Sequence, residues 1–182
     1  MILLINRIIS RIIRALRKAV FKKSIRCKHN QFSLVGNITL INKNVKLGKN
    51  VTIYPNCMFY GDGPIVIGDN SEIGNNVIIY SSNMRGGGVY IANNVMIAAN
   101  CYITDCDHGT KKGTIMRKQE TVVSPVRIGN DVWIGTGVTI LKGSQINDGA
   151  IVGASALVRS TIESNAIAVG TPAKIVKYRQ NG

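Results

Sequence analysis

The feature that most constrains this chain is a period of six residues that runs through most of it. From Leu47 onward, eleven hexads begin with Ile, Leu or Val, continue with a residue that is usually Gly or Ala, and carry a small or β-branched residue at the fifth position. Examples are LGKNVT at 47–52, IGNNVI at 73–78, IGNDVW at 128–133 and VGASAL at 152–157.

A period of six matches neither the 3.6 residues of a helical turn nor the simple alternation of a strand. It fits a solenoid of short strands joined by corners, in which each coil packs only on its neighbours. We expect the first residue of a hexad to point an aliphatic side chain inward and the fifth to point a smaller one beside it. Gly, Asn and Asp at the third and fourth positions suit corners that need positive φ. Three hexads would close one triangular coil.

Composition agrees with an aliphatic core in a single domain, because 45% of the 182 residues are hydrophobic but only 5% are aromatic. Four cysteines, at 27, 57, 101 and 106, show no CxxC spacing and are read as reduced thiols. Cys57 and Cys101 fall at the fifth, inward position and are expected to be small core side chains. Cys106 lies outside that register, and the sequence assigns it no role.

The hexads, together with ITDCDHG at 103–109 and AVGTPAKIVKYR at 168–179, resemble the hexapeptide-repeat acetyltransferase family over roughly residues 47–177. The resemblance implies a mainly β fold, a left-handed parallel β-helix, whose hand is an exception to the usual right-handed crossover. It also implies a homotrimer.

The predicted organisation has three parts. Residues 1–30 form a basic amphipathic helical segment, residues 31–177 form the β-helix domain, and residues 178–182 form a tail. The repeat is interrupted at 83–90 and, more extensively, by an inserted loop at 109–127. Insertions in a solenoid map to loops, which often carry function.

The stretch ITDCDHG resembles the active-site segment of sugar O-acetyltransferases, which implies that His108 is the general base. A sugar hydroxyl is a poor nucleophile until its proton is removed, and imidazole titrates near neutrality. Asn83, Asp105 and Asp107 are candidate contacts to the acceptor. The two carboxylates could instead fix the imidazole tautomer or be solvated. His29, which precedes the repeats, is expected to be solvated.

The resemblance implies that acetyl-CoA binds in a groove between adjacent β-helices. Trp133, in IGNDVWIGTGVTI, would line the site near the reacting end and touch both substrates. Gly135 and Thr136 would flank the pantetheine arm, and Gly153 and Ala154 would face the cofactor, because small residues leave room for backbone hydrogen bonds.

The chain's end supplies candidate partners for the nucleotide phosphates, Lys174 and Lys177, where relatives commonly have Arg. Lysine supplies charge without a bidentate fork, so looser contacts are expected. Arg159–Ser160 stands where galactoside and maltose enzymes have Thr-Lys, and Arg159 could still reach a phosphate. All three could alternatively be ordinary surface charges.

Much of the net charge of +14 comes from residues 1–28, which contain nine Lys and Arg and no acid. Apolar residues recur there at i, i+3 or i+4 and i+7, which predicts an amphipathic helix too often interrupted by arginine to span a bilayer. Residues 1–26 could lie on an anionic membrane surface, or pack on the body or on another subunit. Nucleic-acid binding is disfavoured because the body lacks interleaved aromatic and basic residues.

These features favour a cytoplasmic O-acetyltransferase, peripheral on the inner face of the cell membrane, that modifies a sugar hydroxyl in surface-polysaccharide (O-antigen or capsule) biosynthesis. Serine acetyltransferases usually carry a large helical N-terminal domain, and sugar-nucleotide amine N-acetyltransferases often carry a nucleotide-binding domain. Either activity remains an alternative, as does a non-catalytic solenoid scaffold. A β-helical carbonic anhydrase needs three histidines per zinc and this chain has two in all, so no metal is predicted.

Overall fold

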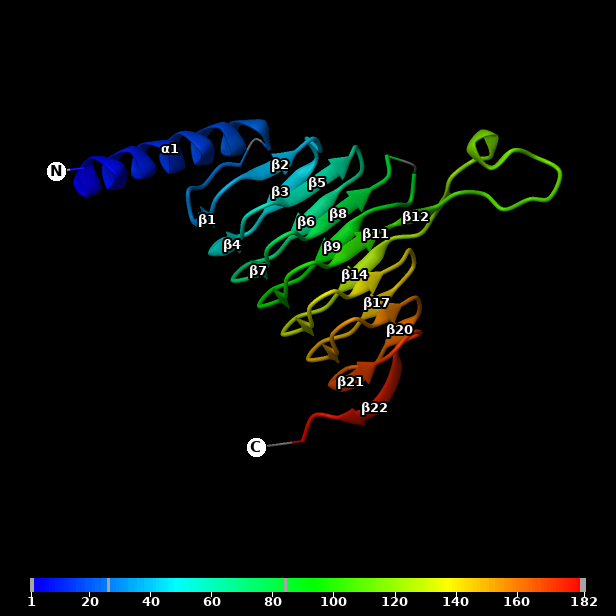
Figure 1. Cartoon of the computed structure of the whole chain (residues 1–182). Helices are drawn as coiled ribbons and strands as arrows, with labels where there is room; N and C mark the ends of the chain where they lie inside the picture. The colour runs from blue at the N-terminus through cyan, green and yellow to red at the C-terminus, as the bar shows by residue number, and fades with distance from the viewer. Residues whose placement is uncertain (1, 26, 84, 181–182) are drawn as a thin grey trace.

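The computed structural model describes residues 2–25, 27–83 and 85–180. Met1 and Arg26 of the predicted helical segment, Met84 of the first interruption, and residues 181–182 of the predicted tail lie outside the described residues. The chain forms one N-terminal helix and a β-solenoid of about seven coils (Figure 1). The predicted mainly β solenoid is confirmed.

Each coil contributes one short strand to each of three sheets, which form the sides of a prism. Sheet A contains β1 (Phe32–Leu34), β4 (Val51–Ile53), β7 (Glu72–Ile73), β10 (Met96–Ile97), β15 (Trp133–Ile134), β18 (Ile151–Val152), β21 (Ala166–Val169) and the antiparallel β22 (Lys174–Tyr178). Sheet B contains β2 (Ile38–Leu40), β5 (Cys57–Gly61), β8 (Ile78–Ser81), β11 (Tyr102–Thr104), β16 (Thr139–Ile140) and β19 (Leu157–Val158). Sheet C contains β3 (Val45–Leu47), β6 (Ile65–Ile67), β9 (Val89–Ile91), β14 (Val126–Ile128), β17 (Gln145–Ile146) and β20 (Thr161–Ile162).

The core follows the hexad register. The first residue of every hexad after Leu47 is buried, and so is the fifth residue of all eleven, including Cys57 and Cys101. Both cysteines are therefore core side chains, as predicted, and neither forms a disulfide. Leu47 itself is half-buried and packs against the core from the side.

Positive φ is confined to the fourth residue of the hexad rather than shared by the third and fourth. All eleven fourth residues have φ between 54° and 74°; seven are Asn or Asp, three are Gly and one is Ser155. Asn and Asp tolerate this conformation better than other residues with a side chain. The asparagines also bond between coils, as Asn76 Nδ2 does to Asn100 Oδ1 at 3.0 Å.

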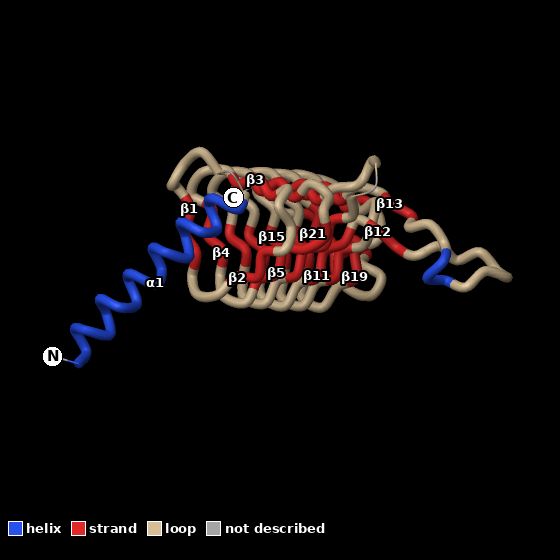
Figure 2. The backbone as a smooth tube through the Cα atoms, turned by 90° about the horizontal axis from the view of Figure 1, so that it is seen from above, coloured by secondary structure: helices blue, strands red, loops and turns tan. Residues whose placement is uncertain are grey.

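The chain visits the sheets in the order A, B, C, so the three edges of the prism can be named by the sheets they join. Both interruptions lie on the B–C edge, in consecutive coils: residues 82–88 connect β8 to β9, and residues 105–125 connect β11 to β14. The second is a β-hairpin arm. Its strands β12 (Cys106–Asp107) and β13 (Val122–Val123) pair antiparallel, and the 3-10 helix η1 (Met116–Lys118) lies near its tip. The arm projects well beyond the prism (Figures 1 and 2).

Helix α1 (Ile2–Ser24) meets the first coil only through its C-terminal part and extends away from the body on the side opposite the arm (Figure 2). Phe21 is buried with Ile25 in the core cluster that includes Phe32 of β1. The remaining described apolar side chains of the helix are largely exposed. Of the alternatives for residues 1–26, packing of the whole apolar stripe on the chain's own body does not agree with this exposure. Among the described residues, no helix has the length and apolar character needed to cross a membrane.

His29 is half-buried rather than solvated, which corrects the sequence-based expectation. Its Nδ1 accepts from the backbone N–H of Gln31 at 3.2 Å, and its Nε2 lies 3.0 Å from the carbonyl oxygen of Leu47. Accepting at Nδ1 leaves Nε2 as the donor to Leu47. The ring thus ties the segment after α1 to the first coil.

Candidate active site

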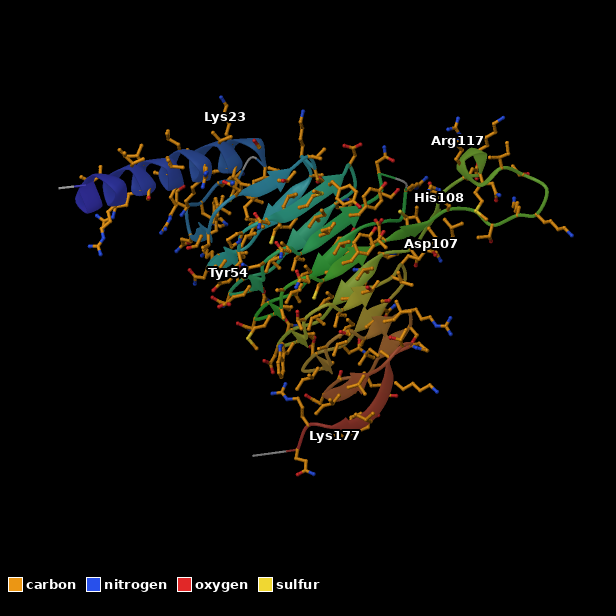
Figure 3. All side chains as sticks on the ribbon, viewed as in Figure 1. Lys23, Tyr54, Asp107, His108, Arg117 and Lys177 are labelled. Carbon is orange, nitrogen blue, oxygen red and sulfur yellow. The ribbon has the colours of Figure 1, made fainter. Side chains whose placement is uncertain are left out.

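His108 is exposed at the base of the arm, directly after β12, on the B–C edge (Figure 3). Strand β11 crosses one side of the prism and ends at this edge, and β12 then leads the chain away from the prism into the arm. Within the described part of the chain, no hydrogen bond or ion pair holds the imidazole. Both ring nitrogens are therefore available to a substrate.

Asp107, the neighbouring residue, faces a different partner. Its Oδ2 lies 3.5 Å from Nζ of Lys142, which sits on the B–C edge of the following coil. The carboxylate is half exposed, so the pair contributes little to stability. Lys142 was not singled out in the sequence, because 35 residues and the whole arm separate it from Asp107; only the stacking of coils brings the two together.

Asp105 is fully buried, and protein donors surround its carboxylate. Oδ2 accepts from the backbone N–H of Gly88 at 2.6 Å and from the Ser81 hydroxyl at 3.1 Å, while Oδ1 accepts from the backbone N–H of Ser82 at 2.8 Å. Asp105 thus ties down both ends of the 82–88 loop. Asn83 lies on this loop with its side chain exposed, beside the edge that carries His108.

A tyrosine cluster that the sequence did not indicate lies on the outer face of sheet B below this corner. The rings of Tyr60 and Tyr80 are 4.6 Å apart, and both residues are half-buried. Burial raises the pKa of Tyr60 to about 12, with further contributions from Tyr102. Burial also raises the pKa of the nearby Cys106 thiol. Cys106 is therefore protonated near neutral pH, unlike a nucleophilic cysteine.

The predicted cofactor residues gather on a different part of the prism. Trp133 points outward from sheet A and is 50% exposed, while its neighbour Ile134 is buried. The A–B edge follows directly, with Gly135 and Thr136 in one coil and Gly153 and Ala154 stacked on them in the next.

The small residues on the A–B edge are required by how closely the coils approach. A Cβ built on Gly135 would lie 2.6 Å from the backbone nitrogen of Ala154. The Thr136 hydroxyl donates to the carbonyl oxygen of Ala99 at 2.8 Å, so it braces this edge from below. Gly135 is buried within this edge, whereas Thr136 and Ala154 are exposed beside it.

The predicted phosphate-binding residues lie in two places, at the end of sheet A and on the B–C edge. Lys174 and Lys177 are exposed on β22, which pairs antiparallel with β21 at the end of sheet A. Arg159 is exposed after β19 and therefore lies on the B–C edge, the His108 edge, two coils further along. The C-terminal strand is anchored by Arg179, whose Nη1 contacts Asp131 Oδ2 at 2.8 Å.

One chain therefore presents two partial sites on different edges. The B–C edge carries Asn83, Asp105, Asp107, His108 and Arg159, and the A side carries Trp133, Gly135, Thr136, Gly153, Ala154, Lys174 and Lys177. The B–C edge is the corner opposite sheet A, so His108 and Trp133 do not share a face of one chain. Across residues 2–25, 27–83 and 85–180, no group of three or more His, Cys, Asp and Glu side chains could hold a metal ion.

Comparison with protein families finds two related models. Residues 125–160 match the bacterial transferase hexapeptide (six repeats), and residues 39–81 and 64–105 match the hexapeptide repeat of succinyl-transferase. Together these matches cover most of the solenoid on both sides of the arm.

Individual proteins agree with the family models. A probable acetyltransferase of Mycobacterium tuberculosis is 39% identical over 120 residues, which is 65% of this chain and 39% of that protein. A candidate lipopolysaccharide biosynthesis O-acetyl transferase of Escherichia coli is 37% identical over 128 residues, 65% of this chain and 62% of that protein. The matched region thus spans less than two thirds of either relative.

A crystal structure of an N-acyltransferase mutant from Bacillus cereus, in complex with dTDP and coenzyme A, has the same fold. It superposes with a TM-score of 0.70 at 20% identity, covering 81% of this chain and 84% of that one. The eleven hexads, the solenoid they build and the matches along it lead to one conclusion: the chain belongs to the hexapeptide-repeat acetyltransferase family.

Proposed function

We propose that this protein transfers an acetyl group from acetyl-CoA to a sugar hydroxyl in surface-polysaccharide assembly, at the cytoplasmic face of the membrane. The observation that carries the proposal is His108, a free and exposed imidazole at the base of an arm, beside a loop fixed by the buried Asp105. The similarity to a lipopolysaccharide O-acetyl transferase supports a saccharide acceptor.

In the proposed reaction, His108 takes the proton of the acceptor hydroxyl as its oxygen attacks the thioester carbonyl of acetyl-CoA. The tetrahedral intermediate collapses by breaking the carbon–sulfur bond, and the departing thiolate takes the proton from the imidazolium. The proposed transfer is direct, without an acyl-enzyme, and the raised pKa of the half-buried Cys106 thiol disfavours a thiolate nucleophile beside His108. Asn83 and Asp107 are the proposed acceptor contacts on the edge that carries His108, and the proposed role of Asp105 is to hold the 82–88 loop.

We further propose that the complete site forms between two chains of a homotrimer. The strands of sheet B carry no charged residue, and their outer face is lined by uncharged side chains: Thr39, Met58, Tyr60, Ile78, Tyr80, Tyr102, Thr139 and Leu157. Sheet C, by contrast, presents Lys46 and Arg127. The two edges that bound sheet B are those that carry the partial sites.

A threefold arrangement with sheet B toward the axis would place the B–C edge of one chain against the A–B edge of the next. His108 would then face the Trp133 and Gly135 of its neighbour, with acetyl-CoA between them. Lys174 and Lys177 from one chain and Arg159 from the other would provide positive charge for the nucleotide phosphates.

The test measures thiol release from acetyl-CoA with a panel of sugars, amino sugars and serine, for the parent and His108→Ala. General-base catalysis predicts a loss of roughly 10²- to 10⁴-fold with acetyl-CoA binding retained. Equal rates would remove His108 from the mechanism. Turnover of amino sugars alone would favour N-acyl transfer, as the fold shared with the Bacillus cereus enzyme allows. No turnover and no acetyl-CoA binding would favour a scaffold.

A further inference from the structure

Helix α1 presents an uncovered apolar face with a defined direction. Six of its side chains, each between 40% and 66% exposed, form a stripe at helical spacing: Ile8, Ile9, Ile12, Ile13, Leu16 and Val20. We call these residues the α1 stripe. Exposed apolar residues occur singly on most proteins, but a continuous stripe marks an interaction site.

The α1 stripe is exposed along its length, and at one border Leu16 and Val20 line a groove that the helix forms with Leu34 and Ile38 of the first coil. Phe21 and Ile25, which are buried against the first coil, lie on the opposite side of the helix at 3.6 residues per turn. Lys18 and Lys22 lie on that same side and both donate at 2.7 Å to Asn30, through its carbonyl oxygen and Oδ1 respectively. These contacts fix the rotation of the helix and leave the stripe exposed.

Charge identifies what covers the α1 stripe. The helix contains seven Lys and Arg residues and no Asp or Glu. Arg17 borders the stripe on one side beside Ile13, and Arg11 borders it on the other beside Ile8. A second α1 packed stripe against stripe would bring two sets of positive charge together with no acid between them. An anionic surface with an apolar interior satisfies both the stripe and its border.

We propose that α1 is an interfacial helix that lies on an anionic lipid bilayer, with the α1 stripe inserted below the headgroups and the flanking arginines among the lipid phosphates. Long basic side chains reach the headgroup level while their methylene stems remain on apolar surface. The first coil, fixed to α1 by Phe21 and Ile25, then stands on the membrane with the solenoid rising from it. This proposal does not depend on acetyl transfer.

The experiment uses the full chain in flotation with two kinds of vesicles: phosphatidylcholine alone, and equal parts phosphatidylcholine and phosphatidylglycerol. The stripe variant is Ile12→Asp with Leu16→Asp. Its matched control is Ile41→Asp, because Ile41 on the body is 62% exposed and Leu16 is 61% exposed. A charge variant carries Arg11→Gln and Arg17→Gln, the two arginines that border the stripe. Circular dichroism checks that each keeps its helix.

We expect the parent and Ile41→Asp to float with the anionic vesicles, and the stripe variant to partition at least tenfold less. The charge variant should lose the preference for anionic over neutral vesicles. Equal binding by the stripe variant and Ile41→Asp would overturn the proposal, as would a parent that floats with neither vesicle. A stripe-dependent increase in molar mass without vesicle binding would instead assign the α1 stripe to a second copy.

Discussion

The backbone N–H of Gly88 donates a 2.6 Å hydrogen bond to the fully buried carboxylate of Asp105. With the N–H of Ser82 on the other carboxylate oxygen, this contact closes the 82–88 loop onto the coil that carries His108. The loop is therefore fixed to the corner that carries His108, the proposed general base.

Asp105→Asn should destabilise the protein and loosen this loop. An amide has one oxygen and one NH2 group, so at least one buried N–H would face a donor, at a cost of about 1–3 kcal/mol in the free energy of unfolding. Urea unfolding measures the loss, and amide exchange at Gly88 should accelerate. Asp107→Asn is the control, because that half-exposed ion pair with Lys142 is worth at most about 1 kcal/mol. Equal losses in the two variants would contradict the assignment.

His108→Ala and Trp133→Ala chains should complement each other if the site lies between two chains. Each variant alone is expected to be impaired at every site. In trimers reassembled from equal amounts, about a quarter of the interfaces pair an intact His108 with an intact Trp133, by random mixing of a cyclic assembly. Activity should therefore return to roughly that fraction of the parent. Mixed trimers with no more activity than the separate variants would argue for a site within one chain.

Lys174→Gln combined with Lys177→Gln should weaken the binding of acetyl-CoA without slowing the chemical step. Both side chains are exposed on β22, far from the proposed proton transfer at His108. Steady-state kinetics should show a higher KM for acetyl-CoA with kcat little changed, the signature of lost uniform binding. Lys49→Gln is the control, since Lys49 is exposed on the C–A edge. A matching rise in KM for the control would point to general surface charge.

Cys57→Val should reduce the amount by which the free energy of unfolding falls as the pH rises into the alkaline range. Burial raises the pKa of this thiol from 9.0 to about 11. Between those values the unfolded chain has lost the proton that the folded chain retains, so the free energy of unfolding falls as pH rises. The shift corresponds to about 2–3 kcal/mol by pH 11.

Valine occupies the fifth position of five other hexads and is buried in each of them, so the variant should fold. Unfolding of parent and variant is compared at neutral pH and across the alkaline range. The difference between them isolates Cys57 from the other groups that titrate there. A constant difference at every pH would contradict the prediction.

The hexad pattern was sufficient to predict the core, because each inward position recurs at a fixed spacing and buries the same kind of side chain. The first coil was less visible: Leu40 and Leu47 are seven residues apart rather than six, so the period starts only at Leu47, although the solenoid begins at Phe32. The corners were predicted from their Asn and Gly residues, but only the structure places the positive φ at the fourth position alone.

The candidate site was less predictable, because contacts between coils join residues that are distant in sequence. In the sequence, Asp105 looks like any other loop carboxylate. Its hydrogen-bond donors lie 17 to 24 residues earlier, on the preceding coil. His108 and Trp133 belong to motifs that follow each other closely, but the arm and one strand of sheet C intervene. The chain turns two corners between them, which separates the two motifs on the prism.

The stacking of coils also fixes the distance between α1 and the coil that carries His108. Sheet A passes from β1, where α1 attaches, through β4 and β7 to β10, whose coil carries His108. Neighbouring strands are about 4.8 Å apart, so three strand spacings separate the coil that carries His108 from the first coil by about 14 Å. With α1 on a bilayer, that spacing would select acceptors by their height above the lipid, and adding or removing one coil would move the proposed site by a single strand spacing.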